Sequence, residues 1–183
     1  MRRQFLALLA AIILAAAPAL ADQDDPRLDP LFDKLRTTED LESALKAERR
    51  IWSIWLEHDD PEIERMMAVG TTAMNIGRLD DALAVFNQMI EVAPNYAEGW
   101  NKRATVFYAL GNYEASLADI EATLEREPRH FGALAGKGLC LAALDDLEAA
   151  IGAFEETLEV HPHSPGAQVN KQLLEDALEE RSI

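Results

Sequence analysis

Cysteine is almost absent from this chain, since Cys140 is the only one among 183 residues. A single cysteine excludes an intramolecular disulfide, so the fold must be stabilised by packing. A lone thiol can serve as a nucleophile, but nothing near Cys140 in the sequence indicates a lowered thiol pKa. We therefore interpret Cys140 as a buried structural residue.

The usual signatures of catalysis and metal binding are also missing. The sequence has no recognisable pairing of a nucleophile with a base, no glycine-rich phosphate loop and no metal-ligand spacing. His130, His161 and His163 come nearest to a metal site, but their place beside prolines in expected linkers favours ordinary surface histidines. We therefore predict no enzyme, no cofactor and no bound metal, and keep an enzyme or metal-binding accessory protein as the less favoured alternative.

Basic residues are scarce, because 17 Lys and Arg stand against 33 Asp and Glu, for a formal charge of −16. The negative electrostatic potential of such a chain repels nucleic acids and anionic lipids and favours neutral or basic partners. Like-charge repulsion also opposes self-association, so we expect a monomer. The abundance of Ala, Leu and Ile argues for a folded core rather than a disordered acidic chain.

The start of the chain has the three parts of a secretory signal peptide. Two arginines precede an apolar run over residues 5–20, and the small residues Ala19 and Ala21 stand at the end of the segment. The run is short for a membrane span, so we expect cleavage after Ala21 rather than an uncleaved anchor. Removal of residues 1–21 takes away both arginines and leaves a formal charge of −18. The mature protein is expected to be exported and soluble, in the periplasm if the source is bacterial, and not inserted in a membrane.

Three prolines reveal an internal repeat. Pro94, Pro128 and Pro162 are spaced by 34 residues, and apolar and small residues keep the same spacing around them. Each unit has two apolar stripes at helical spacing, separated by a turn and ended by the proline, which cannot continue a helix. The units occupy residues 63–96, 97–130 and 131–164.

Small residues and turn residues recur at fixed positions in these units. The first helix of each unit has a small residue where its partner helix would pack closest: Gly70, Ala104 and Gly138. Each turn has a residue suited to left-handed backbone at a helix end: Gly77, Gly111 and Asp145. Both features predict tight helical hairpins.

The middle unit carries the clearest family pattern, in Trp100, Ala104, Phe107, Gly111, Tyr113 and Pro128. This pattern strongly resembles the tetratricopeptide repeat, with Ser116 and Arg103 as harmless departures. The resemblance covers residues 63–162. It implies an all-α, right-handed solenoid of stacked helical hairpins, whose first helices line a concave groove that binds peptides.

The segments on both sides of the repeats are expected to cap the array. Residues 165–183 are interpreted as a C-terminal capping helix, with an apolar side formed by Val169, Leu173, Leu174 and Leu178. Residues 28–60 are interpreted as a degenerate N-terminal helical hairpin and residues 22–27 as a disordered tail. Burial in this hairpin is favoured for Trp52 and Trp55, and a second contact patch is the alternative.

The family's groove positions, carried over unit by unit, give nine candidate contact residues: Met67, Thr71, Met74, Asn101, Thr105, Tyr108, Ala135, Leu139 and Ala142. Most are apolar, while the amide of Asn101 could clamp a peptide backbone and Tyr108 offers a ring and a hydroxyl. The last three could instead merely pack under the C-terminal cap. None is basic, so we expect no recognition of an acidic C-terminal tail.

These features imply an adaptor that binds an apolar, neutral-to-basic segment of a protein or peptide. A groove of three repeats is small, which predicts a transient interface below about 1,200 Å². Family analogy suggests a role in envelope assembly, maturation or division. The main alternative is a self-assembling scaffold, in which a terminal segment of one molecule occupies the groove of the next.

Overall fold

The computed structural model describes residues 25–181, so the predicted signal peptide lies outside the described residues. Within this range the chain forms nine α-helices and no strand. Their bounds are α1 (Leu28–Thr37), α2 (Leu41–Trp55), α3 (Pro61–Asn75), α4 (Leu79–Val92), α5 (Ala97–Ala109), α6 (Tyr113–Arg126), α7 (Phe131–Ala143), α8 (Leu147–Val160) and α9 (Pro165–Arg181). The prediction of an all-α fold is confirmed.

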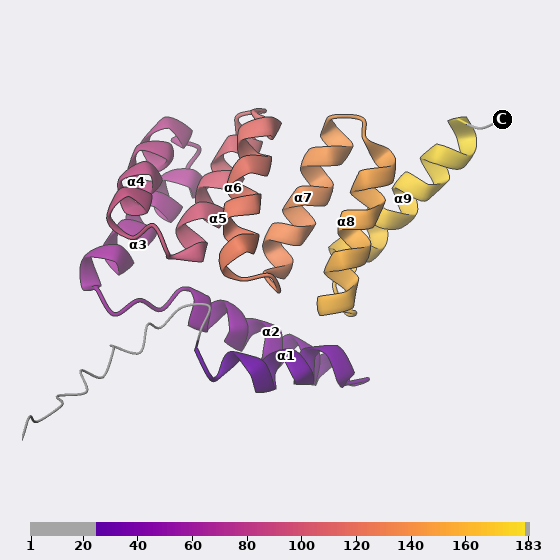
Figure 1. The fold of residues 1–183 in the computed structure, drawn as a ribbon, viewed down its shortest axis with the longest axis horizontal. Coiled ribbons are helices and arrows are strands. Elements are labelled where there is room, and N and C mark those ends of the chain that lie inside the picture. Colours follow the sequence, from indigo (N-terminus) through magenta and orange to yellow (C-terminus); the bar gives the residue numbers. More distant parts are fainter. Residues whose placement is uncertain (1–24, 182–183) are drawn as a thin grey trace, which may run out of the picture.

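Helices α3 to α8 form three hairpins that stack side by side, and α9 packs on α8 (Figure 1). The bounds of α4, α6 and α8 repeat at intervals of 34 residues, and so do those of α5 and α7. Helix α3 begins two residues before this register, because Asp60 caps it and Pro61 suits the first helical turn. No described helix has the length and apolarity needed to cross a membrane.

The small residues inside the hairpins have the predicted role. A Cβ atom added to Gly70 would lie 2.7 Å from the ring of Phe86, and one added to Gly138 would lie 2.7 Å from the ring of Phe154. Both rings are buried. Glycine at these positions therefore lets the two helices of a hairpin approach until an aromatic ring fills the space between them.

The three turns inside the hairpins all use left-handed backbone. The φ angles are 76° at Gly77, 75° at Gly111 and 66° at Asp145. Aspartate tolerates this region better than most residues, because its short side chain can hydrogen-bond locally. The carboxylate of Asp145 also accepts a hydrogen bond of 2.7 Å from Arg181 and so ties the third turn to α9. The substitution of aspartate for glycine is thus compatible with the repeat.

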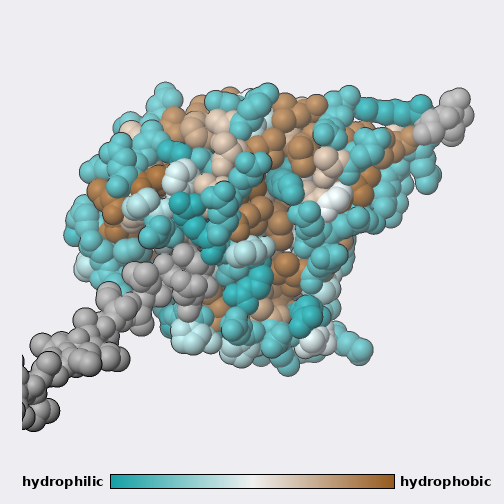
Figure 2. Space-filling view, viewed as in Figure 1, coloured by the Kyte–Doolittle hydropathy of each residue, from teal (hydrophilic) through white to brown (hydrophobic). Residues whose placement is uncertain are grey.

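The N-terminal hairpin does not cap the stack at α3, which corrects our expectation. Helices α1 and α2 lie across the ends of the repeats, beside the turns that join one repeat to the next (Figure 1). Phe131, at the start of α7, belongs to the same buried cluster as the hairpin, and Val160 at the end of α8 packs against it. Hydrophilic residues cover much of the face in Figure 2, and hydrophobic residues are visible both at the α3–α4 end and over the middle of the stack.

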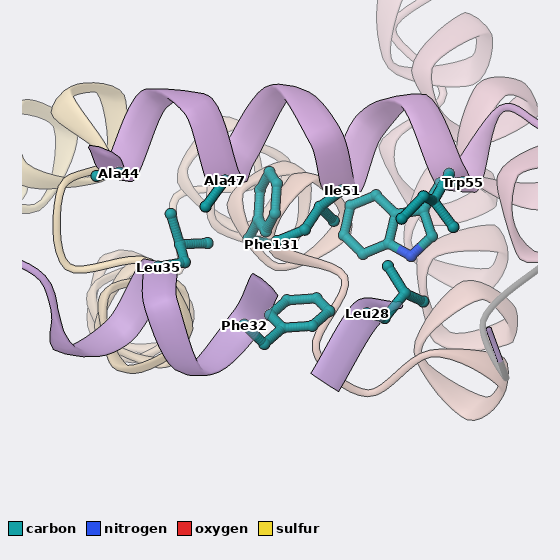
Figure 3. Packing of buried hydrophobic residues seen from close by; sticks show 9 residues of the cluster. Leu28, Phe32, Leu35, Ala44, Ala47, Ile51, Trp55 and Phe131 are labelled. Atoms are coloured by element: carbon teal, nitrogen blue, oxygen red, sulfur yellow. The ribbon is translucent and has the colours of Figure 1, made fainter. Parts of the chain in front are cut away.

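Aromatic side chains fix the hairpin in this place. Figure 3 shows Phe131 between side chains from α1 and α2. The ring of Trp55 stacks on that of His130 at 4.1 Å and makes tilted contacts with the rings of Phe32 and Phe131. Trp55 is only 2% exposed, which confirms its predicted burial, whereas Trp52 is half-buried. The hairpin lies where it does because its apolar residues find their partners at the inter-repeat turns.

The segment before α1 is ordered from residue 25 onwards, which corrects part of the prediction of a disordered tail over 22–27. The guanidinium of Arg27 donates to the carboxylates of Asp25 and Glu57, and the Leu28 amide donates to the Asp25 carbonyl oxygen at 2.9 Å. Residues 22–24 lie outside the described range. These contacts tie the start of α1 to the end of α2.

Candidate functional site

The concave wall of the repeats contains a pocket of about 180 Å³ between α5 and α7. It is lined by five of the nine predicted groove residues: Asn101, Thr105, Tyr108, Ala135 and Leu139. Gly132 and Gly136 also line it, so α7 presents little side-chain volume to α5 at these points. Small residues on α7 thus leave space for an apolar group beside Tyr108.

The floor of this pocket is closed by buried polar groups with partners. The Ser116 hydroxyl donates to the Ala104 carbonyl oxygen at 2.8 Å, and the Cys140 thiol donates to the Ser116 hydroxyl oxygen at 3.2 Å. Burial raises the pKa of the Cys140 thiol above its usual value, which keeps the thiol protonated. Cys140 is therefore a structural residue of the floor, as predicted.

Asn101 has a different role from the one predicted. It is 7% exposed, and its Nδ2 donates to Oε2 of Glu98 at 2.9 Å. Its amide N–H group is thus committed to a carboxylate within the protein and is poorly placed to clamp a peptide backbone. Asn101 contributes to the wall of the pocket, while Tyr108, which is 36% exposed, remains accessible.

Glu98 is a buried carboxylate at the edge of the site. The Lys102 ammonium lies 2.8 Å from its Oε1, and Nε2 of His130 lies 3.0 Å from its Oε2. Burial pushes the pKa of Glu98 upward, but the Lys102 charge and the His130 contacts outweigh burial and hold it below its usual value. Glu98 is therefore ionised, and it joins α5 to the start of α7.

The predicted groove residues of α3 are less available than those of α5 and α7. Met67 is buried in the core of the first hairpin, and the Thr71 hydroxyl donates to its sulfur at 3.7 Å. Met74 is half-buried against the same core. The prediction of Met67 as a contact residue is wrong, because its side chain fills the first hairpin. Ala142 is half-buried and does not line the pocket.

Helix α9 contributes two residues that the sequence analysis assigned to another role. Val169 and Leu173 are 58% and 59% exposed, so they are not on a buried side of the capping helix. They follow Ala135 and Leu139 by 34 residues, which places them at the groove positions of a fourth first helix. The signal for them is the 34-residue spacing of the groove positions themselves, which continues from α7 onto α9. The exposed apolar surface therefore continues from α7 onto α9.

The N-terminal hairpin borders the site at the starts of α5 and α7. A Cβ atom added to Gly132 would lie 2.7 Å from the Trp52 ring, and the Lys102 ammonium lies 5.5 Å from the centre of that ring. Helix α2 therefore limits the space at this end of the pocket. The family pattern contains no signal for such a border, because it describes only the repeats.

Two of the three histidines that came nearest to a metal site are buried, which corrects their interpretation as surface histidines. His130 is fully buried, and its Nδ1 accepts a hydrogen bond from the Ala133 amide, so its Nε2 carries the proton shared with Glu98. His161 is buried beside Phe131, with Nε2 3.5 Å from Glu48. His163 contacts the Thr38 carbonyl oxygen at 2.7 Å. Within residues 25–181, no group of three His, Cys, Asp or Glu side chains is placed to hold a metal ion.

The basic side chains of α5 and α7 are paired with carboxylates. Lys102 pairs with Glu98, and both Nε and one terminal nitrogen of Arg103 donate to Asp119 at 2.7 Å. Lys137 lies 3.1 Å from Glu156. Bidentate arginine–carboxylate pairs are among the stronger protein hydrogen bonds, so Arg103 is firmly held. The pocket itself has no basic lining residue.

Comparison with known proteins agrees with this architecture. A sequence model of the tetratricopeptide repeat matches residues 68–119 and 101–165, which together span more than half of the chain. The chain therefore belongs to the tetratricopeptide repeat family, and the resemblance is confirmed. A TPR repeat-containing protein of Rhizobium etli is 35% identical over 95 residues, which make up 52% of this chain. The chain spans about half of that relative, since the match covers 47% of its length.

Solved structures share the fold at lower identity. The Sgt2 TPR domain from Aspergillus fumigatus has a TM-score of 0.64 and 22% identity, covering 67% of this chain and 83% of its own. The first TPR of Spaghetti (RPAP3), bound to an HSP90 peptide, has a TM-score of 0.63 and 20% identity, covering 66% and 95%. The MamA protein has a TM-score of 0.61 and 20% identity, covering 85% and 83%. These likenesses show the fold of this chain.

Proposed function

We propose that this protein is an adaptor that binds a peptide segment of another protein across the concave faces of α5, α7 and α9. The observation that carries this proposal is the apolar pocket between α5 and α7, with Tyr108 and Leu139 at its wall. Cavities of about 150 Å³ hold benzene in other proteins, so a volume of about 180 Å³ suits one Leu or Phe side chain. Val169 and Leu173 would support the residues that follow this anchor.

The chemistry of the partner follows from the charges around the pocket. The chain carries a formal charge of −16, and the basic residues Lys102, Arg103 and Lys137 are paired with carboxylates of the protein. An acidic peptide would meet repulsion with no basic side chain in the pocket to receive it. We therefore propose an apolar segment with a neutral or basic flank, even though a relative in fold is seen with an HSP90 peptide.

The proposed setting is outside the cytoplasm. Residues 1–21 have the pattern of a cleavable signal peptide, and the acidic mature chain suits a soluble exported protein. In a bacterium this protein would work in the periplasm, as an adaptor in envelope assembly, maturation or division. N-terminal sequencing of the exported protein tests the first step, because a chain that still began at Met1 would contradict cleavage.

Binding to a peptide array tests the proposed function. We expect peptides with one large apolar residue and a basic flank to bind with micromolar affinity, and acidic peptides not to bind. A Tyr108→Ala, Leu139→Glu double variant should lose binding by roughly 30-fold or more, as expected when a central contact is removed. Val92→Glu on α4 is the matched control, because Val92 is exposed but does not line the pocket. Equal loss in the control, or preferred binding of acidic peptides, would contradict the proposal.

A further inference from the structure

The outer face of the first hairpin is an open apolar hollow of about 570 Å³ between α3 and α4. Val69 and Thr72 line it from α3, Ile76 lines it from the residue that follows α3, and Ala84 and Val85 line it from α4. Val69 is 52% exposed and Ile76 is 65% exposed. Hydrophobic residues are visible at this end of the molecule in Figure 2. Helices α3 and α4, which line the hollow, lie at the opposite end of the stack from α9 (Figure 1).

The repeat register shows that this is a stacking face. Thr72 precedes Val106 by 34 residues and Cys140 by 68 residues, so the three share one repeat position. Val106 and Cys140 are fully buried, since Val106 packs in the core of the first hairpin and Cys140 packs beside Ile120 of α6. Thr72 is exposed. The face of α3 that carries Thr72 therefore corresponds to the buried faces of α5 and α7 that carry Val106 and Cys140. No described helix of the chain covers it.

The hairpin that precedes α3 in the sequence cannot cover this face where it lies. Helices α1 and α2 are held at the inter-repeat turns by Trp55 on His130, by Phe131, and by a hydrogen bond of 2.9 Å from the Tyr96 hydroxyl to the Trp55 carbonyl oxygen. Covering α3 would break these contacts. None of the described helices can therefore cover the hollow while these contacts are kept.

The two ends of the stack differ in the surface that each would offer to a second copy of the chain. The outer side of α9 carries exposed Gln168, Gln172 and Glu179, which offer no apolar surface to a neighbouring α3. Head-to-tail stacking is therefore disfavoured. The hollow, in contrast, has only Arg65, Arg78 and Asp81 as charged lining residues, a net charge of +1 on a chain of −16. Contact between two such faces therefore brings few of the acidic residues of the two copies together.

We propose that two copies of this chain associate through their α3–α4 faces, as a two-fold symmetric dimer. An isologous contact is self-complementary, so Val69 and Ile76 of each copy can cover the apolar hollow of the other. Arg65 and Arg78 each pair with a carboxylate of their own hairpin, Glu62 and Asp81, and these charges can also be shared across a two-fold axis. The contact leaves the pocket between α5 and α7 free in both copies. It revises the expectation of a monomer, which rested on net charge.

Sedimentation velocity on the exported form of the protein tests the dimer. We expect a monomer–dimer equilibrium that shifts to dimer as the protein concentration rises to about 100 μM. Added salt should favour the dimer, because it screens the repulsion between two acidic chains. A Val69→Glu, Ile76→Glu variant should be monomeric throughout, with unchanged helical circular dichroism and unchanged peptide binding. The matched control is Val169→Glu, Leu173→Glu, which alters two equally exposed residues at the other end and should remain dimeric.

Cysteine cross-linking tests the orientation. Thr72→Cys should form a disulfide-linked dimer with itself under mild oxidation, since the interface would bring the two α3 helices together. Gln172→Cys on α9 should form none, alone or mixed with Thr72→Cys. A wild-type protein that stays monomeric at the highest concentration, or a dimer that survives Val69→Glu, Ile76→Glu, would overturn the proposal. So would a mixed cross-link between positions 72 and 172.

Discussion

The segments on either side of the repeats, α1–α2 and α9, solve different packing problems. Helix α9 continues the repeat register. Ala167 of α9 is buried, as is Ala133 at the same repeat position of α7. The α1–α2 hairpin has no place in this register and packs through aromatic rings on the inter-repeat turns. Contacts that follow a repeat can be read from spacing, whereas contacts between unrelated segments depend on surfaces that only folding brings together.

The largest expected effect is on the hairpin. Trp55→Ala removes a buried ring that contacts His130, Phe131 and Phe32, and should lower the free energy of unfolding by about 3–5 kcal/mol. Leu174→Ala on α9 removes a half-buried side chain and should cost about 1 kcal/mol. Urea denaturation followed by circular dichroism measures both. Equal losses of unfolding free energy in the two variants would contradict the difference in packing between the α1–α2 hairpin and α9.

A smaller effect is expected where the register places a ring against glycine. Gly138→Ala brings a Cβ atom to 2.7 Å from the Phe154 ring and should destabilise the fold by about 1–3 kcal/mol. Gly152→Ala is the matched control, because a Cβ atom there meets nothing within 4 Å. The control should be stabilised by about 0.5–1 kcal/mol, since alanine favours helix more than glycine does. Thermal unfolding of both variants would show the opposite signs, and a stabilised Gly138→Ala would refute the close packing.

Acid should weaken the hairpin contact at His161. Burial lowers the pKa of His161 below its usual value, although Glu48 acts in the opposite direction. The unfolded chain therefore binds a proton more readily than the folded one, so stability is lost as the pH falls through the ordinary histidine range, near 6.5. We expect His161→Gln to reduce the pH dependence of urea unfolding between about pH 7.5 and 5.5. An unchanged pH dependence would show that His161 does not link protonation to the hairpin contact.

The smallest expected effect is on the contact of α9 with the third turn. Arg181→Ala breaks the pair with Asp145, but both side chains are exposed and solvent screens their attraction. No change in the midpoint of thermal unfolding should be detectable. A clear loss of stability would mean that α9 is held by this pair rather than by its place in the repeat register.

The fold of the repeats could be predicted because each contact recurs. Gly70 and Gly138 predicted close packing, and Gly77 and Asp145 predicted left-handed turns, since these roles depend on local backbone and repeat position. The place of α1–α2 could not be predicted, because nothing in Trp55 indicates that its partner is His130. The spacing indicates where such side chains stand on a helix but not which distant ring they meet.

The candidate site was predicted in part for the same reason. The groove positions carried over from the family placed Tyr108 and Leu139 on one wall, and the structure brings them to one pocket. The family's positions could not show that Met67 is buried or that Asn101 is bound to Glu98, because these depend on side-chain partners. Val169 and Leu173 continue the groove positions by 34 residues, but their apolar character favoured a buried side of α9, and the structure leaves both exposed.

Photocross-linking from the groove tests the central claim most directly. A photoreactive phenylalanine analogue at position 108 lines the pocket. The same analogue at position 87, an exposed position of α4 outside the pocket, is the control. After irradiation of cells that export the protein, mass spectrometry identifies the segments joined to each position. We predict adducts at position 108 with apolar, neutral or basic segments of a partner, and none of these at position 87. The same adducts at both positions, or adducts at position 87 alone, would contradict a peptide-binding site between α5 and α7.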